Sequence, residues 1–529
     1  MKTKYLAVSL LAIFRFALFL PQTEAVVPPP DGGYPGFTTA EGTNALKNLT
    51  TGVANTATGW YSLFANSTGN YNTAVGAGTL IFNNGEQNTA TGVAALLSNT
   101  TGLGNTATGV AALSSNTTGD VNTATGINTL RSNTDGIENT ADGFSALTSN
   151  TTGDRNTATG VQALLVNATG DDNTAVGYAA LQSSTTVTGN TAVGSQALQN
   201  NTSGGGNAAT GFGALQNNTA GNNNTANGFG ALQTNTTGND NTATGTGALL
   251  SNVGAQNTAN GSQALLSDTT GSENTADGYQ ALFATTTGAN NTAIGRQALL
   301  SNIAGSDNTA IGRDALANNP NGSHNIAVGV GAGVSLNAGD DNIDIGNAGG
   351  GSESDTIRIG TNQTRTFIAG VTGVPVTGTA VVVNIFGQLG VAPSSQRFKE
   401  NITPMNKASE ALLALKPVAF RYKKEIDPAG SPQFGLLAED VEKVNPDLVV
   451  HDKQGKAYSV RYDQVNAMLL NEFLKEHKAF VEEKREVEQQ QKEIDALKTE
   501  LKEQRAFIEK VNDKMELRAS ASQTTANNQ

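Results

Sequence analysis

The amino-acid sequence predicts a mainly β repeat fold, a β-solenoid or β-roll with about 17 residues per coil, followed by a small α+β domain and a C-terminal coiled coil. Three observations predict it. A motif recurs from residue 38 to residue 350, the composition changes near Gly351, and a seven-residue apolar period runs from 473 to 515. A short fixed period is typical of stacked coils, in which each repeat contacts only its neighbours. We therefore expect a fibre-like array rather than an enzyme globule over most of the 529 residues.

The repeat has the consensus N-T-A-x-G-x-x-A-L-x-x-N-T-T-G-x-x, with a degenerate first copy, TTAEG, at Thr38. Its anchoring asparagines are 16 or 17 residues apart, a register that a disordered tract has no reason to keep. They are Asn55, Asn72, Asn88, Asn105, Asn122, Asn139, Asn156, Asn173, Asn190, Asn207, Asn224, Asn241, Asn257, Asn274, Asn291, Asn308, Asn325 and Asn342. The strict period therefore favours order in spite of the 61 glycines.

Within each repeat, the first five residues alternate as a short strand does. Ala158 represents the small residue expected to face inward, and the next position accepts Val176 in one repeat and Asp142 in another. A position this tolerant is expected to face solvent. The Ala-Leu pair is the dependable apolar anchor, and Asn-Thr-Thr-Gly is typical of a turn. We expect one coil per repeat, with Asn and Thr stacked in ladders.

The repeat offers little apolar surface for a single chain to bury. One buried Leu contributes roughly 1.5–3 kcal/mol and each Ala roughly 1 kcal/mol, whereas ordering one coil costs about 25 kcal/mol. Hydrogen bonds contribute roughly 0.5–1.5 kcal/mol each. A lone thin coil is therefore expected to be unstable, and we predict that several chains share one core as a homotrimer.

The repeat resembles the head repeats of trimeric autotransporter adhesins, although those have a shorter period. It resembles more closely the NTAVG…AL…NTTG arrays of bacterial and phage tail-fibre-like proteins. A cell-surface glycan is a candidate ligand of such an array. A glycosidase would need carboxylates paired at a set spacing, and Asp142, Asp171 and Asp277 are not paired at equivalent positions. Thr-Ala-Thr steps would suit ice binding, but Val75 and Ile294 interrupt that pattern.

Composition excludes several classes of function. The net charge of −13 does not favour a nucleic-acid partner. Cysteine is absent, so disulfides and thiolate metal sites are excluded. His324, His451 and His477 lie far apart in the sequence. We therefore expect no metal site and no cofactor.

The N-terminus predicts export. Lys2 and Lys4 precede a short apolar run, and Ala25 ends a plausible cleavage site, so residues 1–25 are interpreted as a signal peptide and residues 26–37 as a Pro/Gly linker. The apolar run is short for a transmembrane helix. We expect a secreted or cell-surface protein without a stable membrane span after signal removal; an uncleaved membrane anchor is the alternative.

Beyond the array, residues 351–393 are expected to form a β-rich collar with short strands near 356–360, 366–370 and 381–384. The next segment, Ser394-Ser395-Gln396-Arg397-Phe398-Lys399-Glu400-Asn401-Ile402, resembles the opening S-D-x-R-x-K-x-x-I of the peptidase S74 family, the C-terminal intramolecular chaperones of endosialidase-type tail spikes. Further matches at 412–418, 420–423, 435–441 and 458–462 extend the resemblance to about residues 394–490.

This resemblance implies a domain that trimerises the fibre and then cuts itself off just before the motif serine. Carried over by position, Ser394 is the nucleophile and Lys399 the base. A lysine acts as a base only where its ammonium is desolvated or crowded, which an assembled trimer could provide. Ser395 stands where the family usually has Asp, which places the competence of cleavage in question. The alternative is that Ser394 and Lys399 are inert linker residues.

A coiled coil is predicted over residues 473–515, overlapping the end of the small domain, and the tail at 516–529 is expected to be disordered. The alternative is one amphipathic helix packed on a globule. Its heptad positions are Phe473, Phe480, Val487, Ile494, Leu501, Ile508 and Met515.

Together these patterns predict a secreted or surface adhesin-like fibre whose C-terminal domain assembles three chains, aligns their monotonous repeats and possesses autoproteolytic serine peptidase activity directed only at itself. The alternatives are a glycan-acting tail-spike-like enzyme and a passive array that binds ice or polysaccharide.

Overall fold

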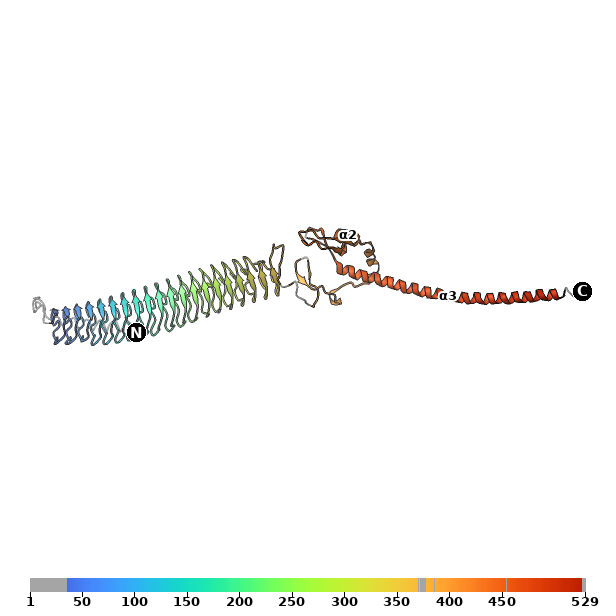
Figure 1. The fold of residues 1–529 in the computed structure, drawn as a ribbon. Coiled ribbons are helices and arrows are strands. Elements are labelled where there is room, and N and C mark those ends of the chain that lie inside the picture. The colour runs from blue at the N-terminus through green and yellow to red at the C-terminus, as the bar shows by residue number, and fades with distance from the viewer. Residues whose placement is uncertain (1–35, 370, 372–376, 385, 453, 526–529) are drawn as a thin grey trace. The chain divides into compact units, whose positions relative to one another are not determined.

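The computed structural model describes residues 36–369, 371, 377–384, 386–452 and 454–525. The chain divides into two compact units, residues 1–368 and residues 369–529 (Figure 1). The predicted signal peptide, and all but the last two residues of the predicted linker, lie outside the described residues. None of the helices in the described part is long and apolar enough to cross a membrane.

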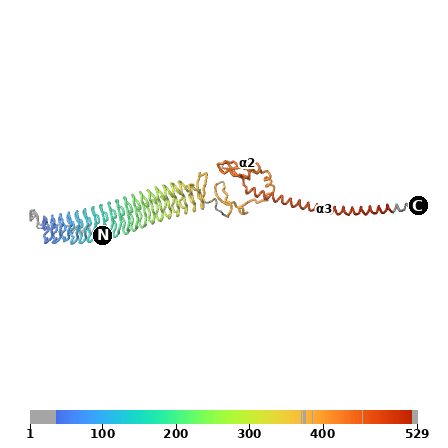
Figure 2. Tube along the Cα trace, viewed as in Figure 1, coloured from blue at the N-terminus to red at the C-terminus, as the bar shows by residue number. Residues whose placement is uncertain are grey.

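The first unit is a β-solenoid with one short strand per coil (Figures 1 and 2). Its 20 strands form one sheet, in which each strand pairs in parallel with the next one along the chain. They are β1 (Thr39–Glu41), β2 (Thr56–Thr58), β3 (Thr73–Val75), β4 (Thr89–Thr91), β5 (Thr106–Thr108), β6 (Thr123–Thr125), β7 (Thr140–Asp142), β8 (Thr157–Thr159), β9 (Thr174–Val176), β10 (Thr191–Val193), β11 (Ala208–Thr210), β12 (Thr225–Asn227), β13 (Thr242–Thr244), β14 (Thr258–Asn260), β15 (Thr275–Asp277), β16 (Thr292–Ile294), β17 (Thr309–Ile311), β18 (Ile326–Val328), β19 (Ile343–Ile345) and β20 (Ile357–Ile359).

The predicted faces of the strands are confirmed. Ala107 of β5 is fully buried and pairs with Ala124 of β6, whereas Thr108 beside it is exposed. The same pattern of a buried middle residue and an exposed third residue holds from β2 to β19. Strand pairing in register therefore places equivalent residues above one another along the whole array.

Two internal asparagine ladders join the coils. The Asn122 amide Nδ2 donates to Asn105 Oδ1 at 3.1 Å and to the Gly136 carbonyl at 2.8 Å, and its backbone N–H donates to the same Asn105 oxygen. In the second ladder, Asn116 Nδ2 donates to Asn99 Oδ1 at 2.8 Å. These asparagines are 0% exposed, so each satisfies the polar groups that its own burial removes from water.

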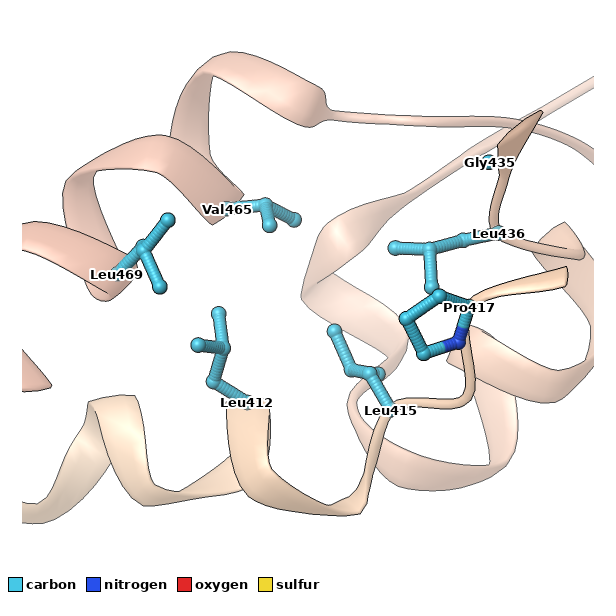
Figure 3. A pocket seen from close by; sticks show the side chains of 7 residues that line it. All are labelled: Leu412, Leu415, Pro417, Gly435, Leu436, Val465 and Leu469. Carbon is cyan, nitrogen blue, oxygen red and sulfur yellow. The ribbon is translucent and has the colours of Figure 1, made fainter. Parts of the chain in front are cut away.

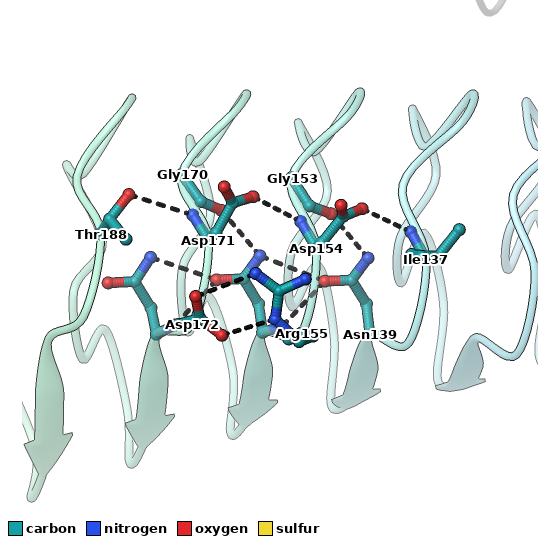
Figure 4. A network of polar contacts seen from close by, with 11 residues as sticks. Ile137, Asn139, Gly153, Asp154, Arg155, Gly170, Asp171, Asp172 and Thr188 are labelled. Carbon is teal, nitrogen blue, oxygen red and sulfur yellow. Dashed lines mark hydrogen bonds and ion pairs between the residues drawn. The ribbon is translucent and has the colours of Figure 1, made fainter.

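A third ladder lies on the outside of the turns (Figure 4). Asp154 Oδ1 accepts the backbone N–H of Ile137 at 2.8 Å, and Asp171 Oδ1 accepts that of Asp154 at 2.8 Å. Arg155 and Asp172 form an ion pair at 2.7 Å beside it, and this contact lowers the pKa of Asp172. Side chains of one coil thus bind unpaired backbone groups of the coil before it.

The turn in each coil requires left-handed backbone at the core leucine. Leu113 has φ 51° and Leu130 has φ 49°, and the equivalent leucines share this conformation. A β-branched side chain would be strained there, which explains why the rank holds Leu in preference to Ile or Val. The coil also needs a true glycine after each strand, because a Cβ at Gly109 would lie 2.3 Å from the Gly126 carbonyl oxygen.

Coils of 16 residues lose their missing residue in the turn. Asn150 Nδ2 spans three residues to reach the Gly153 carbonyl, whereas Asn83 Nδ2 spans two residues to reach that of Gly85. The bond that closes the turn is therefore kept in both lengths, and strand register is unaffected.

The expectation of a core shared between chains is wrong for the array. The leucines from Leu63 to Leu316 are all 0% exposed within one chain, so each coil closes its own core. The energy estimate failed because it omitted the asparagine side-chain ladders. This finding removes the shared-core argument for a trimer and leaves oligomeric state as a prediction.

The predicted collar also needs correction. Its first strand, β20, pairs with β19 and completes the solenoid sheet, with Asp344 paired in register to Arg358. The predicted strand at 366–370 is absent from the residues described there. Only β21 (Val382–Val383) and β22 (Leu389–Gly390) remain in the collar, as a short antiparallel pair.

The second unit contains a small α+β domain and a long helix. In chain order its elements are η1 (Gln396–Phe398), η2 (Asn406–Ala414), β23 (Val418–Phe420), β24 (Gln433–Gly435), α2 (Ala438–Val444), η3 (Pro446–Leu448), β25 (Val449–His451), β26 (Ala457–Val460) and α3 (Tyr462–Thr525). The strand pairs β23–β24 and β25–β26 are antiparallel. A small core of Val441, Leu448, Val449, Val460 and Met468 holds α2, η3, β25, β26 and the start of α3 together.

Helix α3 has 64 residues and leaves its heptad positions exposed in the single chain. It continues to Thr525, so the expected disordered tail is helical as far as the structure describes it. No second helix covers α3 along residues 473–515 among the described elements, and the predicted coiled coil therefore stays a prediction.

Candidate functional site

Ser394 and Lys399 flank the single turn of η1. Ser394 precedes Ser395, which begins the turn, and the backbone N–H of Lys399 ends it by donating to the Gln396 carbonyl at 3.0 Å. Both residues are exposed. The segment before Ser394 is exposed too, so the bond between Pro393 and Ser394 lies on an accessible loop.

The single chain does not bring the two side chains into a catalytic contact. In the described residues, neither Ser394 Oγ nor Lys399 Nζ takes part in a hydrogen bond or ion pair. A serine nucleophile needs its base within hydrogen-bond reach, and a lysine base needs a desolvated ammonium. One exposed chain supplies neither condition.

The rest of the motif is also turned to solvent. The Arg397 guanidinium lies 4.6 Å from the centre of the Phe398 ring, whose side chain is 59% exposed. Ile402 is 61% exposed. Apolar side chains beside a cleavage motif are free to be covered by another surface.

A buried polar cluster that the sequence did not reveal joins η2 to α3. Ser409 is 0% exposed, and its Oγ donates to Glu472 Oε1 and accepts from Asn471 Nδ2 at 2.6 Å. Lys475 Nζ lies 2.7 Å from the same Glu472 oxygen, and it lowers the pKa of Glu472 together with the Ser409 hydroxyl. The cluster fixes the first turns of α3 on the domain.

This second serine–lysine pair is not a nucleophile and base. Lys475 is held as a charged partner of Glu472 at 2.7 Å and approaches Ser409 Oγ only at 3.3 Å. A lysine paired with a carboxylate favours its protonated form. The partners lie 62 to 66 residues apart in the chain, so spacing alone carried no signal for them.

An open apolar hollow of about 230 Å³ lies beside this cluster (Figure 3). Leu412 and Leu415 of η2 point toward Val465 and Leu469 of α3 across it, and Leu436 closes another side. Leu469 is 54% exposed. The described residues contain no cluster of three or more His, Cys, Asp or Glu side chains placed to hold a metal ion.

The fold and this site define a β-solenoid structural protein with a small C-terminal domain that carries a serine–lysine motif. Residues 394–450 match the family model of peptidase S74, the chaperone of endosialidase. The match confirms the resemblance found in the motif and gives the chain a tail-fibre-like arrangement, a solenoid followed by a chaperone domain. Comparisons with curated proteins and with solved structures found no match.

Proposed function

We propose that this is a secreted or surface fibre protein whose C-terminal domain is an intramolecular trimerisation chaperone that cuts the chain before Ser394. The observation that carries the proposal is the family match, which begins at Ser394 and follows a long solenoid. An extracellular or phage-associated place suits such a domain.

Assembly would proceed through α3. Its exposed heptad residues, Ile494 and Leu501 among them, are 46% and 53% exposed and suit a parallel coiled coil. Three helices in register would place three solenoids in register. The array needs such alignment, because its equivalent coils can pair one repeat out of step at little local cost.

Cleavage would follow assembly. Ser394 and Lys399 are exposed and apart in one chain, so a partner subunit must supply the desolvation that frees the lysine from its proton. Lys399 Nζ then takes the Ser394 proton, and Oγ attacks the Pro393 carbonyl carbon. The carbon–nitrogen bond breaks, the Ser394 amine takes a proton, and water hydrolyses the ester. The products are two chains that end at Pro393 and begin at Ser394.

The test is to express the full-length chain and to follow cleavage by intact mass and assembly by native mass. Wild type should release residues 394–529, whereas Ser394→Ala and Lys399→Ala should stay whole and trimeric. Ser395→Ala and Lys407→Ala are matched controls that should still be cut. A whole wild-type trimer would overturn the cleavage step and leave the chaperone role standing. A monomeric native mass for the uncut variants would overturn both.

A further inference from the structure

Two neighbouring ranks of the solenoid surface carry its large exposed apolar side chains. One rank is the third residue of each strand, and the other follows two positions later, after the repeat glycine. We call them together the outer strip. Its apolar members are Trp60, Val75, Val93, Val110, Ile127, Phe144, Val161, Val176, Tyr178, Val193, Phe212, Phe229, Tyr279, Ile294, Ile311, Val328, Val330 and Ile345.

The two ranks compensate for each other. Where the strand residue is Asp142 or Asn227, the second rank holds Phe144 or Phe229. The reverse holds where the second rank is polar, as in the pairs Val193 with Ser195, Ile294 with Arg296 and Ile311 with Arg313. From β2 to β19, only the coils of β13 and β14 lack a large apolar side chain in both ranks. Ranks that merely faced water would have no reason to compensate.

The strip is continuous along the array. Strands pair in register, so residues of one rank stack at about 4.8 Å from coil to coil. Phe212 and Phe229 show the contact directly, with ring centres 5.4 Å apart and planes inclined by 11°. The two ranks are two residues apart in each coil, which brings them within about 7 Å of each other.

The size of the strip exceeds what an isolated protein surface normally shows. Its side chains range from 37% exposed at Val176 to 68% exposed at Val330. Eighteen such residues expose an area on the order of 1,000 Å², compared with roughly 300–600 Å² for the largest apolar patch of a typical monomer. A standard stable interface buries about 800 Å² on each partner.

We infer that the outer strip is the surface along which the solenoids of neighbouring copies of this chain lie against one another. A second copy presents a strip of the same length, the same rise per coil and the same apolar character. The area matches what a stable interface needs, and α3 of the same chain exposes a second apolar stripe for self-association. The inference rests on the proposed trimeric assembly and adds that the arrays, each with its own closed core, associate on their outsides.

Cross-linking tests this directly, because the chain contains no cysteine. In a parallel assembly in register, a residue on the strip faces its own counterpart. Phe212→Cys in the full chain should therefore cross-link with a short bis-maleimide, and so should Ile494→Cys on α3. Ile303→Cys, which is 45% exposed but off the strip, is the matched control and should not cross-link.

The outcomes separate this inference from the proposed function. Cross-linking at 494 without cross-linking at 212 would overturn the strip contact and leave the α3 assembly intact. Equal cross-linking at 212 and 303 would show unspecific contact and would also overturn it. Failure at both 494 and 212 would remove the assembly on which the inference rests.

Polar substitution supplies a second measurement. Phe144→Ser, Phe212→Ser and Phe229→Ser together should abolish the cross-link of a Val110→Cys reporter, since serine already occupies the second rank at Ser195 and Ser262. Phe82→Ser, Leu103→Thr and Ile303→Thr, exposed but off the strip, should preserve it. If the strip variant instead keeps the cross-link but loses binding to insoluble cellulose or chitin, the strip is a glycan surface and the inference is wrong.

Discussion

The solenoid and the C-terminal unit treat their apolar residues in opposite ways. Every core leucine from Leu63 to Leu316 is fully buried within one chain. In the second unit five apolar residues form the core, and α3 leaves Phe473 61% and Phe480 63% exposed. The difference teaches that the repeats can close coil by coil without help, whereas the shorter, less repetitive unit presents surfaces that await partners. The assembly information in this chain is therefore expected to lie mainly where the core is smallest.

The strongest way to break the self-sufficiency of the array is to add one methyl group. Gly109→Ala should cost about 4 kcal/mol or more, because the new Cβ would lie 2.3 Å from the backbone of the next coil. Gly213→Ala is the control: its rank holds Ala111 in another coil, and the loss should be about 1 kcal/mol. Fluorescence of Trp60, the one tryptophan, follows unfolding of the array. Equal losses in the two variants would contradict the coil contact.

The array also contains a buried acid that sharpens the comparison through pH. Asp268 is 0% exposed in an asparagine rank; Gly271 donates to its Oδ1, while Oδ2 has no hydrogen-bond partner in the described chain. Burial raises the pKa of Asp268 from 3.8 to about 7. The folded state therefore holds this proton more tightly than the unfolded state, and stability should fall as pH rises from 3.8 to about 7.

Asp268→Asn should remove this pH dependence and stabilise the array at pH 8 by on the order of 3 kcal/mol. The exposed carboxyl of Asp142 provides a control, since Asp142→Asn should leave the slope of wild type unchanged. Thermal unfolding measured at pH 4, 6 and 8 decides the matter. A wild-type stability that stays level across that range would show that Asp268 is not a buried acid.

Loss of one internal asparagine should cost somewhat less. Asn133 Nδ2 donates to Asn116 Oδ1 at 2.8 Å and to the Gly136 carbonyl at 2.9 Å, and Asn133 Oδ1 accepts from Asn150. Asn133→Ala leaves these buried partners unpaired and should cost about 2–3 kcal/mol. Asn200→Ala removes an exposed side-chain pair and should change stability by less than about 0.5 kcal/mol. Denaturant titration of both variants would show whether the ladders carry the fold.

The smallest effect is expected in the second unit. Ser409→Ala removes the hydroxyl that bonds Glu472 and Asn471, and it should loosen α3 on η2 by about 1–2 kcal/mol. Hydrogen exchange should speed up in the first turns of α3 and remain unchanged in the array. Thr499→Ala, which removes an exposed hydroxyl bond within the same helix, is the control. Unaltered exchange near Glu472 would show that the cluster does not hold the helix.

Much of the array could be predicted from the sequence because each of its contacts repeats. The alternation in Asn-Thr-Ala-x-Gly correctly placed Ala107 inside and Thr108 outside. The closed core was missed, because the number of bonds made by Asn122 depends on a coil geometry that no single repeat displays. Left-handed Leu113 was missed for the same reason, since propensity alone assigns that conformation to glycine or asparagine.

The C-terminal site was predictable only where its motif is contiguous. Ser394 and Lys399 follow from a local pattern, and their exposed loop is visible in the structure. Ser409 joins Glu472 across 63 residues, so its role appears only once α3 has folded back on η2. The role of Ser394 itself depends on a partner chain and stays a prediction.

The turn that keeps its closing bond in coils of 16 and 17 residues makes the solenoid a ruler. Each added or lost repeat changes the reach of the protein by about 4.8 Å and leaves the contacts at both new neighbours the same. A lineage of such proteins could vary reach in small equal steps while keeping both ends unchanged. Length then becomes a property that changes by counting, independent of the chemistry at either end.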